Sequence, residues 1–126
     1  MKLKSLSNLE QRVMDIVWEF KKCSTRDVLN KINKDKKYAY TTIATLLNRL
    51  NEKGLVIKKI EKEGYVYSPK VSRESYTKNV AQTFLKRFIN SFGDSAIASF
   101  AESVDKLPQK KKKYFLKILE EHDKNK

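Results

Sequence analysis

Three short helical patterns followed at once by a hairpin pattern are the feature that most limits how this chain can fold. The first pattern begins at "SNLE", where Ser7 can cap a helix and Glu10 can reach back to the cap. The second begins at "STRD", with Ser24 and Asp27 in the same positions. The third is "YAYTTIATLLNRLNEKG", which ends at Gly54, a residue that tolerates positive φ. Three helices are therefore expected before residue 55.

The hairpin pattern comprises "LVIKKIE" and "YVYS", two runs rich in β-branched and aromatic residues that are separated by "KEG" and end at Pro69. Three helices followed by a hairpin is the layout of a winged helix, in which the third helix enters the DNA major groove and the hairpin touches the flanking backbone. The fold-class prediction is mostly α with a small β-hairpin wing (α+β). A winged helix-turn-helix would occupy residues 1–71.

Residues 72–126 are predicted to form a helical dimerisation domain. A long helical pattern with an aromatic or apolar residue at every fourth position is followed by "DSAIASFAESV" and "QKKKKYFLKILEEH". So short a helical segment rarely encloses enough apolar surface to offset its chain entropy, so we expect a partner chain. The residues assigned to the dimer interface are Tyr76, Val80, Phe84, Leu85, Phe88, Ile89, Phe92, Ile97, Phe100, Phe115, Ile118 and Leu119.

The charge balance favours a polyanionic partner. The 126 residues include 28 Lys and Arg against 15 Asp and Glu, for a net charge of +13. Such a balance favours nucleic acid or an acidic membrane surface, although a lysine-rich proteome would also produce it. No apolar run is long enough to span a membrane, and "MKLKSLSNLEQ" lacks the apolar middle of a signal peptide. We therefore expect a cytoplasmic protein without membrane insertion.

Few residues are suited to metal binding or catalysis. The one cysteine, Cys23, permits no internal disulfide and no zinc-ligand pair, and His122 is the only histidine. The glycines punctuate secondary structure and form no phosphate-binding loop. The sequence predicts no metal site, no cofactor and no enzymatic activity.

The third helical pattern has one apolar face and one face of short polar side chains. The apolar face comprises Ile43, Leu46, Leu47 and Leu50, and the opposite face comprises Thr41, Thr42, Thr45, Asn48 and Arg49. Threonine methyls can pack on thymine methyls, their hydroxyls can bond base edges or phosphates, and a guanidinium can bind guanine or phosphate in bidentate fashion. Threonine is only mildly unfavourable in helices, so simple tolerance of solvent remains an alternative.

Candidate phosphate-binding groups surround this face. Lysines precede the third helix and lie on the hairpin, and "TR" opens the second helix. Tyr40 can reach a phosphate through its hydroxyl, or can pack beside the small core. The predicted DNA-binding residues are Thr25, Arg26, Lys37, Tyr40, Thr41, Thr42, Thr45, Asn48, Arg49, Lys59 and Lys62.

The sequence resembles, nearly end to end, the bacterial repressors of penicillinase and methicillin-resistance genes, which are related to copper-responsive repressors. The resemblance is carried by "LSNLEQRVMDIVWEF", "YAYTTIATLLNRLNEKGLV", "GYVYSPKVSRESY" and "ASFAES". It implies a homodimer that binds inverted-repeat, double-stranded DNA operators with TACA/TGTA half-sites and represses a β-lactamase-type operon. The cysteine pairs of the copper-responsive branch are absent from the C-terminal part, which argues against copper sensing.

The resemblance also implies inactivation by proteolysis. Members of the family are cut at an Asn-Phe bond after a membrane β-lactam sensor with a protease domain is activated. The matching bond here is Ser99–Phe100, with Ser in place of Asn. A helix of small residues can open locally for a protease, whereas Phe100 can equally serve as a packing residue of the dimer.

Two other functions fit parts of the sequence. A winged-helix module that binds protein would use the threonine face for docking and would show little preference among DNA sequences. A repressor of the same family with a different inducer would bind an operator but would not be cut by a β-lactam sensor.

Overall fold

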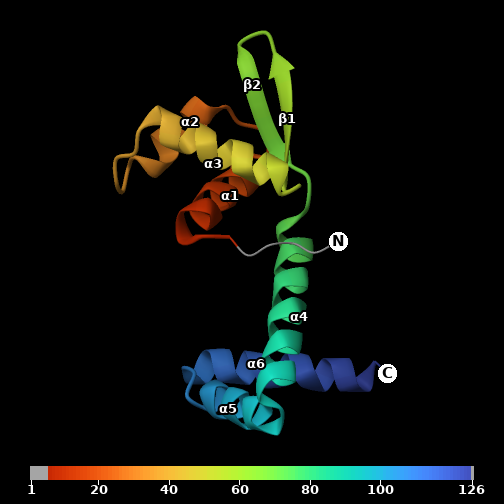
Figure 1. Cartoon of the computed structure of the whole chain (residues 1–126). Helices are drawn as coiled ribbons and strands as arrows, with labels where there is room; N and C mark the ends of the chain where they lie inside the picture. The colour runs from red at the N-terminus through yellow and green to blue at the C-terminus, as the bar shows by residue number, and fades with distance from the viewer. Residues whose placement is uncertain (1–5, 126) are drawn as a thin grey trace. The chain divides into compact units, whose positions relative to one another are not determined.

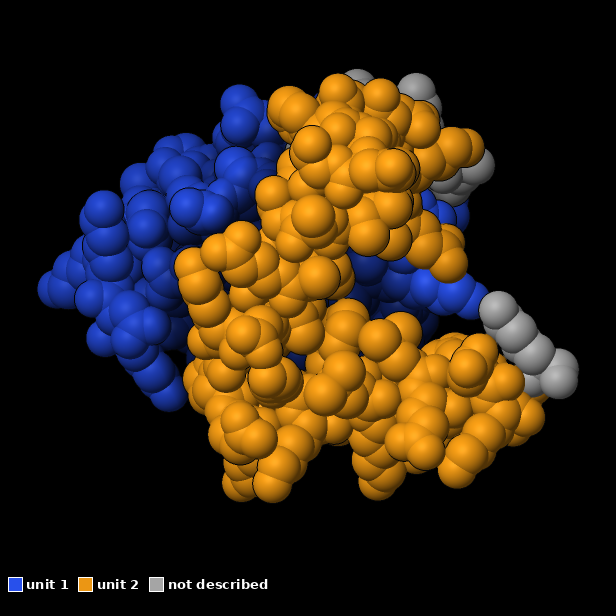
Figure 2. Space-filling view, turned by 90° about the horizontal axis from the view of Figure 1, so that it is seen from below, with its two compact units in different colours: residues 1–81 blue, residues 82–126 orange. Residues whose placement is uncertain are grey.

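The computed structural model describes residues 6–125, which form six helices and one two-stranded antiparallel sheet. The chain forms two compact units, residues 1–81 (unit 1) and 82–126 (unit 2), coloured separately in Figure 2. The order of the elements confirms the predicted fold class (Figure 1). The elements are α1 (Asn8–Phe20), α2 (Thr25–Ile32), α3 (Tyr40–Glu52), β1 (Val56–Glu61), β2 (Gly64–Pro69), α4 (Arg73–Phe92), α5 (Asp94–Asp105) and α6 (Gln109–Lys124).

The first two helices begin at the predicted capping boxes. The Ser7 hydroxyl accepts from the Glu10 N–H at 3.2 Å, and the Glu10 carboxylate accepts from the Ser7 N–H at 3.1 Å. Ser24 and Asp27 make the equivalent pair at 3.1 and 2.9 Å. Each pair satisfies N–H groups that a helix start otherwise leaves unbonded, so the sequence itself fixes where α1 and α2 begin.

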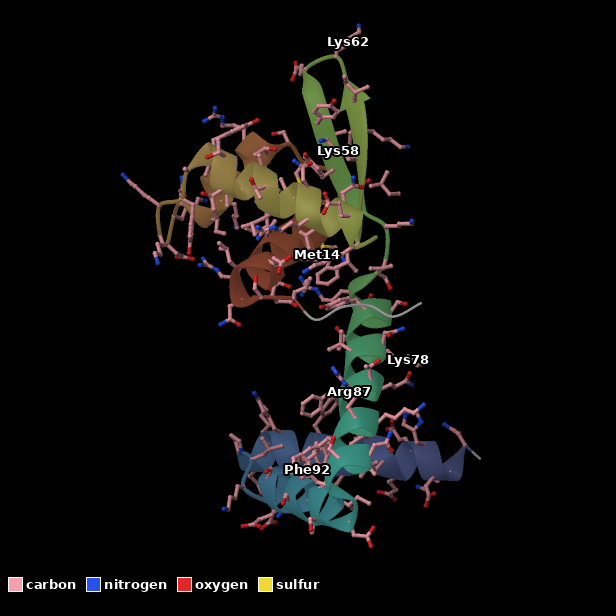
Figure 3. The ribbon with its side chains drawn as sticks, viewed as in Figure 1. Met14, Lys58, Lys62, Lys78, Arg87 and Phe92 are labelled. Carbon is pink, nitrogen blue, oxygen red and sulfur yellow. The ribbon has the colours of Figure 1, made fainter. Side chains whose placement is uncertain are left out.

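The hydrophobic core of unit 1 fixes the orientation of α3. The side chains of α3 that face α1 and α2 are completely or almost completely buried, as is Met14 of α1, labelled in Figure 3. Burying one such side chain contributes roughly 1.5–3 kcal/mol. The buried aliphatic residues of the three helices are Val13, Met14, Ile16, Val17, Val28, Leu29, Ile32, Ile43, Leu46, Leu47 and Leu50.

The hairpin follows α3 directly and is tied to the start of α2. Gly54 has a φ of +79° after α3, as expected for a helix-ending glycine. In the register of β1 and β2, Lys58 lies opposite Tyr67. The backbone of Tyr67 also pairs with that of Cys23 through two hydrogen bonds, of 3.0 and 2.7 Å. The base of the hairpin is therefore fixed to the segment that enters α2.

The first turns of α4 belong to unit 1. Trp18 donates its indole N–H to the Val71 carbonyl at 2.9 Å, and its ring lies 5.5 Å from that of Tyr76. Tyr76 is only 5% exposed, and burial is the main cause that raises its pKa. Val80 packs against the same core. The predicted boundary between the DNA-binding and dimerisation domains, after residue 71, lies just before α4. The boundary between the two compact units falls later, after Ala81. The division into a DNA-binding and a dimerisation domain stays a prediction.

Unit 2 has little core of its own. It comprises the rest of α4 together with α5 and α6, and among residues 82–125 only Ala96 is buried. Phe88 lies between Phe84 and Phe92, with ring centroids 5.8 and 5.4 Å apart. Phe100 of α5 lies 6.1 Å from Phe115 of α6. Across residues 6–125, no helix combines the length and apolar character that crossing a membrane requires.

Candidate nucleic-acid interface

The outer face of α3 presents the predicted reading residues. Thr41, Thr42, Thr45 and Arg49 are exposed, opposite the leucines that pack into the core. Together with the edge of Leu46 they line one shallow depression of about 280 Å³. Four of the five residues predicted for this face therefore share one surface.

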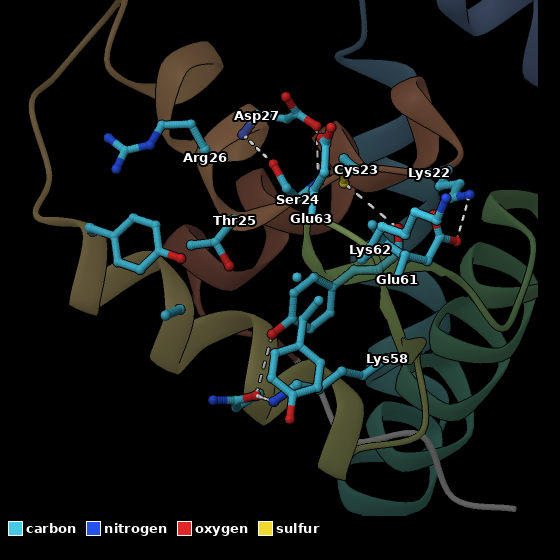
Figure 4. A pocket seen from close by; sticks show the side chains of 17 residues that line it. Lys22, Cys23, Ser24, Thr25, Arg26, Asp27, Lys58, Glu61, Lys62 and Glu63 are labelled. Carbon is cyan, nitrogen blue, oxygen red and sulfur yellow. Dashed lines mark hydrogen bonds and ion pairs between the residues drawn. The ribbon is translucent and has the colours of Figure 1, made fainter.

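A larger groove, of about 1220 Å³, lies between the start of α2, α3 and the hairpin (Figure 4). Arg26 and Asp27 contribute from α2, Ala44 and Asn48 from α3, and Lys58 from the hairpin. The groove and the threonine depression share no lining residue. Ala44 and Asn48, one turn apart, place the groove along the flank of α3 next to that depression.

Acidic side chains also line this groove, but two of them are already paired. Asp27 accepts the Ser24 N–H in the capping box. Glu61 forms an ion pair with Lys22 at 2.6 Å. Glu63 adds a third carboxylate, so the groove is lined by three acidic residues together with the cations Lys22, Arg26, Lys58 and Lys62.

The predicted groups around α3 occupy different environments. The guanidinium of Arg26 lies over the Tyr40 ring, 5.1 Å from its centroid, so these two exposed residues present a joint surface. Lys37 is exposed in the loop before α3. Thr25, by contrast, is only 6% exposed, because it lies in the first turn of α2 beside the core. Its assignment to DNA binding stays a prediction that its burial does not favour.

The structure gives Asn48 a role that helical periodicity alone does not indicate. Its side-chain carbonyl accepts from the Lys58 ammonium at 2.9 Å and from the Tyr67 hydroxyl at 3.5 Å. The Lys58 ammonium also lies 4.1 Å from the centroid of the Tyr65 ring and 5.9 Å from that of Tyr67. Asn48 is therefore half-buried between α3 and the hairpin, whereas its neighbours on the outer face are exposed.

The lysines of the hairpin divide between its two faces. Lys58 lies opposite Tyr67 and faces the groove, whereas Lys59 lies opposite Val66 on the other face. Lys62, in the turn, is exposed and lines the groove; Lys58 and Lys62 are both labelled in Figure 3. Lys58 is one of the hairpin lysines expected to bind phosphate, but the list of predicted DNA-binding residues contains only Lys59 and Lys62. The signal that finds Lys58 is the period-2 alternation that puts it on the face of the hairpin tyrosines.

Glu10 and Cys23 of unit 1 have pKa values that are shifted by their surroundings in the fold. The hydrogen bond from Lys53, at 2.7 Å, is the largest cause that lowers the pKa of Glu10. Burial, assisted by the charge of Asp27, raises the pKa of the Cys23 thiol to about 11, so the thiol stays neutral at physiological pH. Among residues 6–125 no cluster of His, Cys, Asp and Glu has the geometry to hold a metal ion.

The residues predicted for a dimer interface fall into two groups. Tyr76 and Val80 pack within unit 1, so their burial needs no second chain. In unit 2, Phe84 is 62% exposed, and most of the other members are also exposed. Phe88, Ile89, Phe115 and Ile118 are half-buried. The exposed members are Phe84, Leu85, Phe92, Ile97, Phe100 and Leu119.

The Ser99–Phe100 bond lies in the middle of α5. The Ser99 carbonyl accepts from the Ser103 hydroxyl at 3.0 Å, and the Phe100 ring contacts Phe115 of α6. A protease that cuts this bond needs an extended strand, so part of α5 has to unfold first. Cleavage at this bond stays a prediction.

The sequence matches one family almost throughout. The family model described as "Penicillinase repressor" matches residues 6–121. The penicillinase repressor of Bacillus licheniformis is 31% identical over 121 residues, which cover 96% of this chain and 94% of that protein. The methicillin resistance regulatory protein MecI of Staphylococcus aureus (strain N315) is 26% identical over 100 residues, covering 79% of this chain and 81% of that protein. Both relatives are named as regulators, and neither as an enzyme.

Part of the chain also has solved counterparts. The solution structure of the Bacillus licheniformis BlaI monomeric form in complex with the blaP half-operator matches with a TM-score of 0.51 and 29% identity, over 60% of this chain and 92% of that chain. A second solution structure, of the DNA-binding domain of the repressor BlaI, has a TM-score of 0.53. These matches agree with the winged helix inferred from the order of the elements. The chain belongs to the penicillinase repressor family.

Proposed function

We propose that this protein is a sequence-specific, DNA-binding transcriptional repressor of a β-lactamase-type resistance operon. The observation that carries the proposal is the outer face of α3, where Thr41, Thr42, Thr45 and Arg49 are exposed side by side. Cationic groups of α2 and the hairpin flank this helix. Such a surface combines base-reading groups with phosphate-binding groups, which is what recognition in the major groove requires.

The target is double-stranded operator DNA with TACA/TGTA half-sites. Threonine methyl groups pack favourably on thymine methyl groups, and Arg49 can bind a guanine edge in bidentate fashion. The BlaI complex with a half-operator, which matches 60% of this chain, supports operator DNA as the partner. The protein acts in the cytoplasm, where bacterial operators are accessible.

The repressor acts as a homodimer on inverted repeats. The exposed aromatic and aliphatic residues of α4, α5 and α6 supply the apolar surface that a second copy covers. The two copies of unit 1 in the dimer then contact the two half-sites of the inverted repeat. Because the two copies are joined through the dimer, binding at the second half-site is effectively intramolecular.

Repression ends when a membrane β-lactam sensor protease triggers cleavage at Ser99–Phe100. The small residues of α5 support this proposal, because helices with little buried surface open at low cost. Incubating the full chain with an activated sensor protease is expected to release a fragment that ends at Ser99, identified by mass spectrometry. Recovery of only the intact chain would indicate a repressor of the same family that responds to a different inducer.

DNA binding is tested by fluorescence anisotropy of the full chain with a labelled inverted-repeat operator. We expect scrambled duplex of equal length to compete at least roughly 10³-fold less well, the lower end of specific-to-nonspecific ratios. We also expect the affinity to fall steeply with salt, because phosphate neutralisation releases counterions. Equal competition by both duplexes would instead indicate a protein-interaction module with nonspecific DNA affinity.

A further inference from the structure

We propose that Lys58 sets the hydrogen-bonding character of Asn48, so that Asn48 presents only donors to the DNA. The proposal rests on the proposed function and names a positioning residue for the same surface. It begins from the contacts around the Asn48 side chain, whose carbonyl oxygen accepts from Lys58 at 2.9 Å and from Tyr67 at 3.5 Å.

The orientation of the Asn48 amide follows from the chemistry of Lys58. A lysine ammonium has three donors and no acceptor, so only the oxygen end of the amide can face it. With two donors at the oxygen, the NH₂ group lies at the opposite end of the amide. Asn48 lines the groove between α3 and the hairpin, so this NH₂ group is available to an acceptor bound there.

Lys58 is itself held in place by the hairpin. Its ammonium lies 4.1 Å from the centroid of the Tyr65 ring, within the range of a cation–π interaction. Tyr67 is almost completely buried, and its backbone is fixed by the two hydrogen bonds to Cys23. The Lys58 ammonium therefore lies between the rings of Tyr65 and Tyr67 and the Asn48 carbonyl. These contacts hold the ammonium in position to donate to Asn48.

The consequence concerns which acceptors Asn48 can bind. An asparagine that reads adenine uses both ends of its amide, because it donates to N7 and accepts from the N6 amino group. With both lone pairs of its oxygen engaged, by Lys58 at 2.9 Å and by Tyr67 at 3.5 Å, Asn48 can only donate. Its partner is then a phosphate oxygen or an acceptor on a base edge, and the adenine-specific bidentate contact is excluded.

The test compares Lys58→Met with Lys59→Met in the full chain. Both changes remove one charge from the same strand, but only Lys58 touches Asn48. We expect Lys58→Met and Asn48→Ala to be coupled two- to tenfold in operator affinity, the range for one hydrogen bond, and Lys59→Met and Asn48→Ala to be uncoupled. In the Asn48→Ala background the Lys58→Met loss is expected to be smaller than in the Asn48 protein, because the group that Lys58 positions is gone, whereas the Lys59→Met loss is expected to be the same in both.

Two outcomes would overturn the proposal. Equal coupling of Lys58→Met and Lys59→Met to Asn48→Ala would show that Lys58 acts only through its charge. An undiminished Lys58→Met effect in the Asn48→Ala background would show that Lys58 contacts the DNA directly. The duplex used distinguishes the acceptors: a loss shared by operator and scrambled duplex indicates a phosphate, and a loss confined to operator indicates a base edge.

A readout without DNA separates this proposal from the proposed function. In the free protein, the side-chain amide signals of Asn48 in a ¹⁵N–¹H spectrum are expected to shift with Lys58→Met and to stay in place with Lys59→Met. We expect this shift even if the wild-type protein shows no preference for operator. That lack of preference would contradict the proposed function but not the positioning role of Lys58. Unchanged Asn48 signals in Lys58→Met would contradict the positioning role of Lys58 and leave the proposed function untouched.

Discussion

Residues 6–81 and residues 82–125 are both rich in amphipathic helix, yet they differ in what the apolar faces contact. In unit 1 the faces of α1, α2 and α3 converge on one core of completely buried side chains. In unit 2 the aromatic residues of α4, α5 and α6 touch one another in pairs and remain largely exposed. Helical periodicity therefore identifies an apolar face, but the arrangement of neighbouring elements decides whether the same chain covers it.

The largest expected effect comes from truncating a leucine in the core of unit 1. Leu47→Ala is expected to lower the free energy of unfolding by about 2–5 kcal/mol, because Leu47 is completely buried and its loss leaves a cavity. The matched change in unit 2, Leu119→Ala, removes the same atoms from a side chain that is half exposed. At concentrations where the chain is monomeric we expect it to cost less than about 1 kcal/mol. Urea unfolding followed by circular dichroism measures both, and equal losses would contradict the contrast between the units.

The next effect tests whether a second copy covers unit 2. Phe84→Asp is expected to raise the dimer dissociation constant by about 30-fold or more, as for loss of a hot-spot side chain of about 2 kcal/mol. Because Phe84 is already exposed within its own chain, the fold of the monomer is expected to persist. Sedimentation velocity over a concentration series measures the association. The control is Thr83→Asp, which adds the same charge at the exposed neighbouring position; an unaltered Phe84→Asp dimer would place the interface elsewhere.

The third prediction is that a residue on the outer face of unit 1 affects DNA binding without affecting the stability of the core. Arg49→Ala is expected to weaken operator binding by about 1–3 kcal/mol while leaving the stability and the association of the chain unchanged. Arg49→Lys keeps the charge but loses the planar pair of donors, so it is expected to recover nonspecific binding better than operator preference. Anisotropy titrations with operator and scrambled duplex distinguish the two. Full operator affinity in Arg49→Ala would remove this residue from the reading face.

The smallest effect concerns an ion pair inside unit 1. Because the pKa of Glu10 is lowered in the folded state, its carboxylate stabilises the fold above the ordinary value of 4.5, and this stabilisation is lost as pH falls through the lowered pKa. Glu10→Gln keeps the side-chain acceptor for Ser7 and loses the charge opposite Lys53. We expect a cost of about 1 kcal/mol at pH 7 that disappears in acid.

The control for Glu10→Gln lies in unit 2. The ion pair between Glu102 and Lys106 is exposed on both sides, so Glu102→Gln is expected to change stability by less than about 0.5 kcal/mol at either pH. Urea unfolding at pH 7 and below pH 4 measures both variants. A Glu10→Gln cost that persists unchanged in acid would show that the effect is not electrostatic.

The local features of unit 1 were predictable because their causes are local. A capping box needs residues three positions apart, and Gly54 follows the last apolar residue of α3, so a short window of sequence contains the whole signal. The core-facing and outer faces of α3 follow from a period of 3.6 residues. The fold class could be predicted for the same reason, since it depends on the order of such elements.

Contacts between distant elements were not predictable from the same patterns. Tyr76 continues the every-fourth-residue series of α4, and only its packing on Trp18 distinguishes it from Phe84. The bond between Lys58 and Asn48 joins α3 to the hairpin. Period-2 alternation puts Lys58 on the face of the hairpin tyrosines, but it does not encode which side chain of α3 contacts that lysine. Thr25 looks accessible at a helix start but lies beside the core. Side-chain partners across elements depend on packing, which single-sequence patterns do not specify.

The burial of Cys23 has a practical consequence for spectroscopy on this protein. The chain contains one cysteine, and burial raises its pKa to about 11, so maleimide reagents at neutral pH meet very little thiolate there. A cysteine introduced on the tip of the hairpin or on α6 would be labelled selectively without replacing the native one. Dyes or spin probes can therefore be attached at chosen positions while the packing between the base of the hairpin and the second helix stays intact.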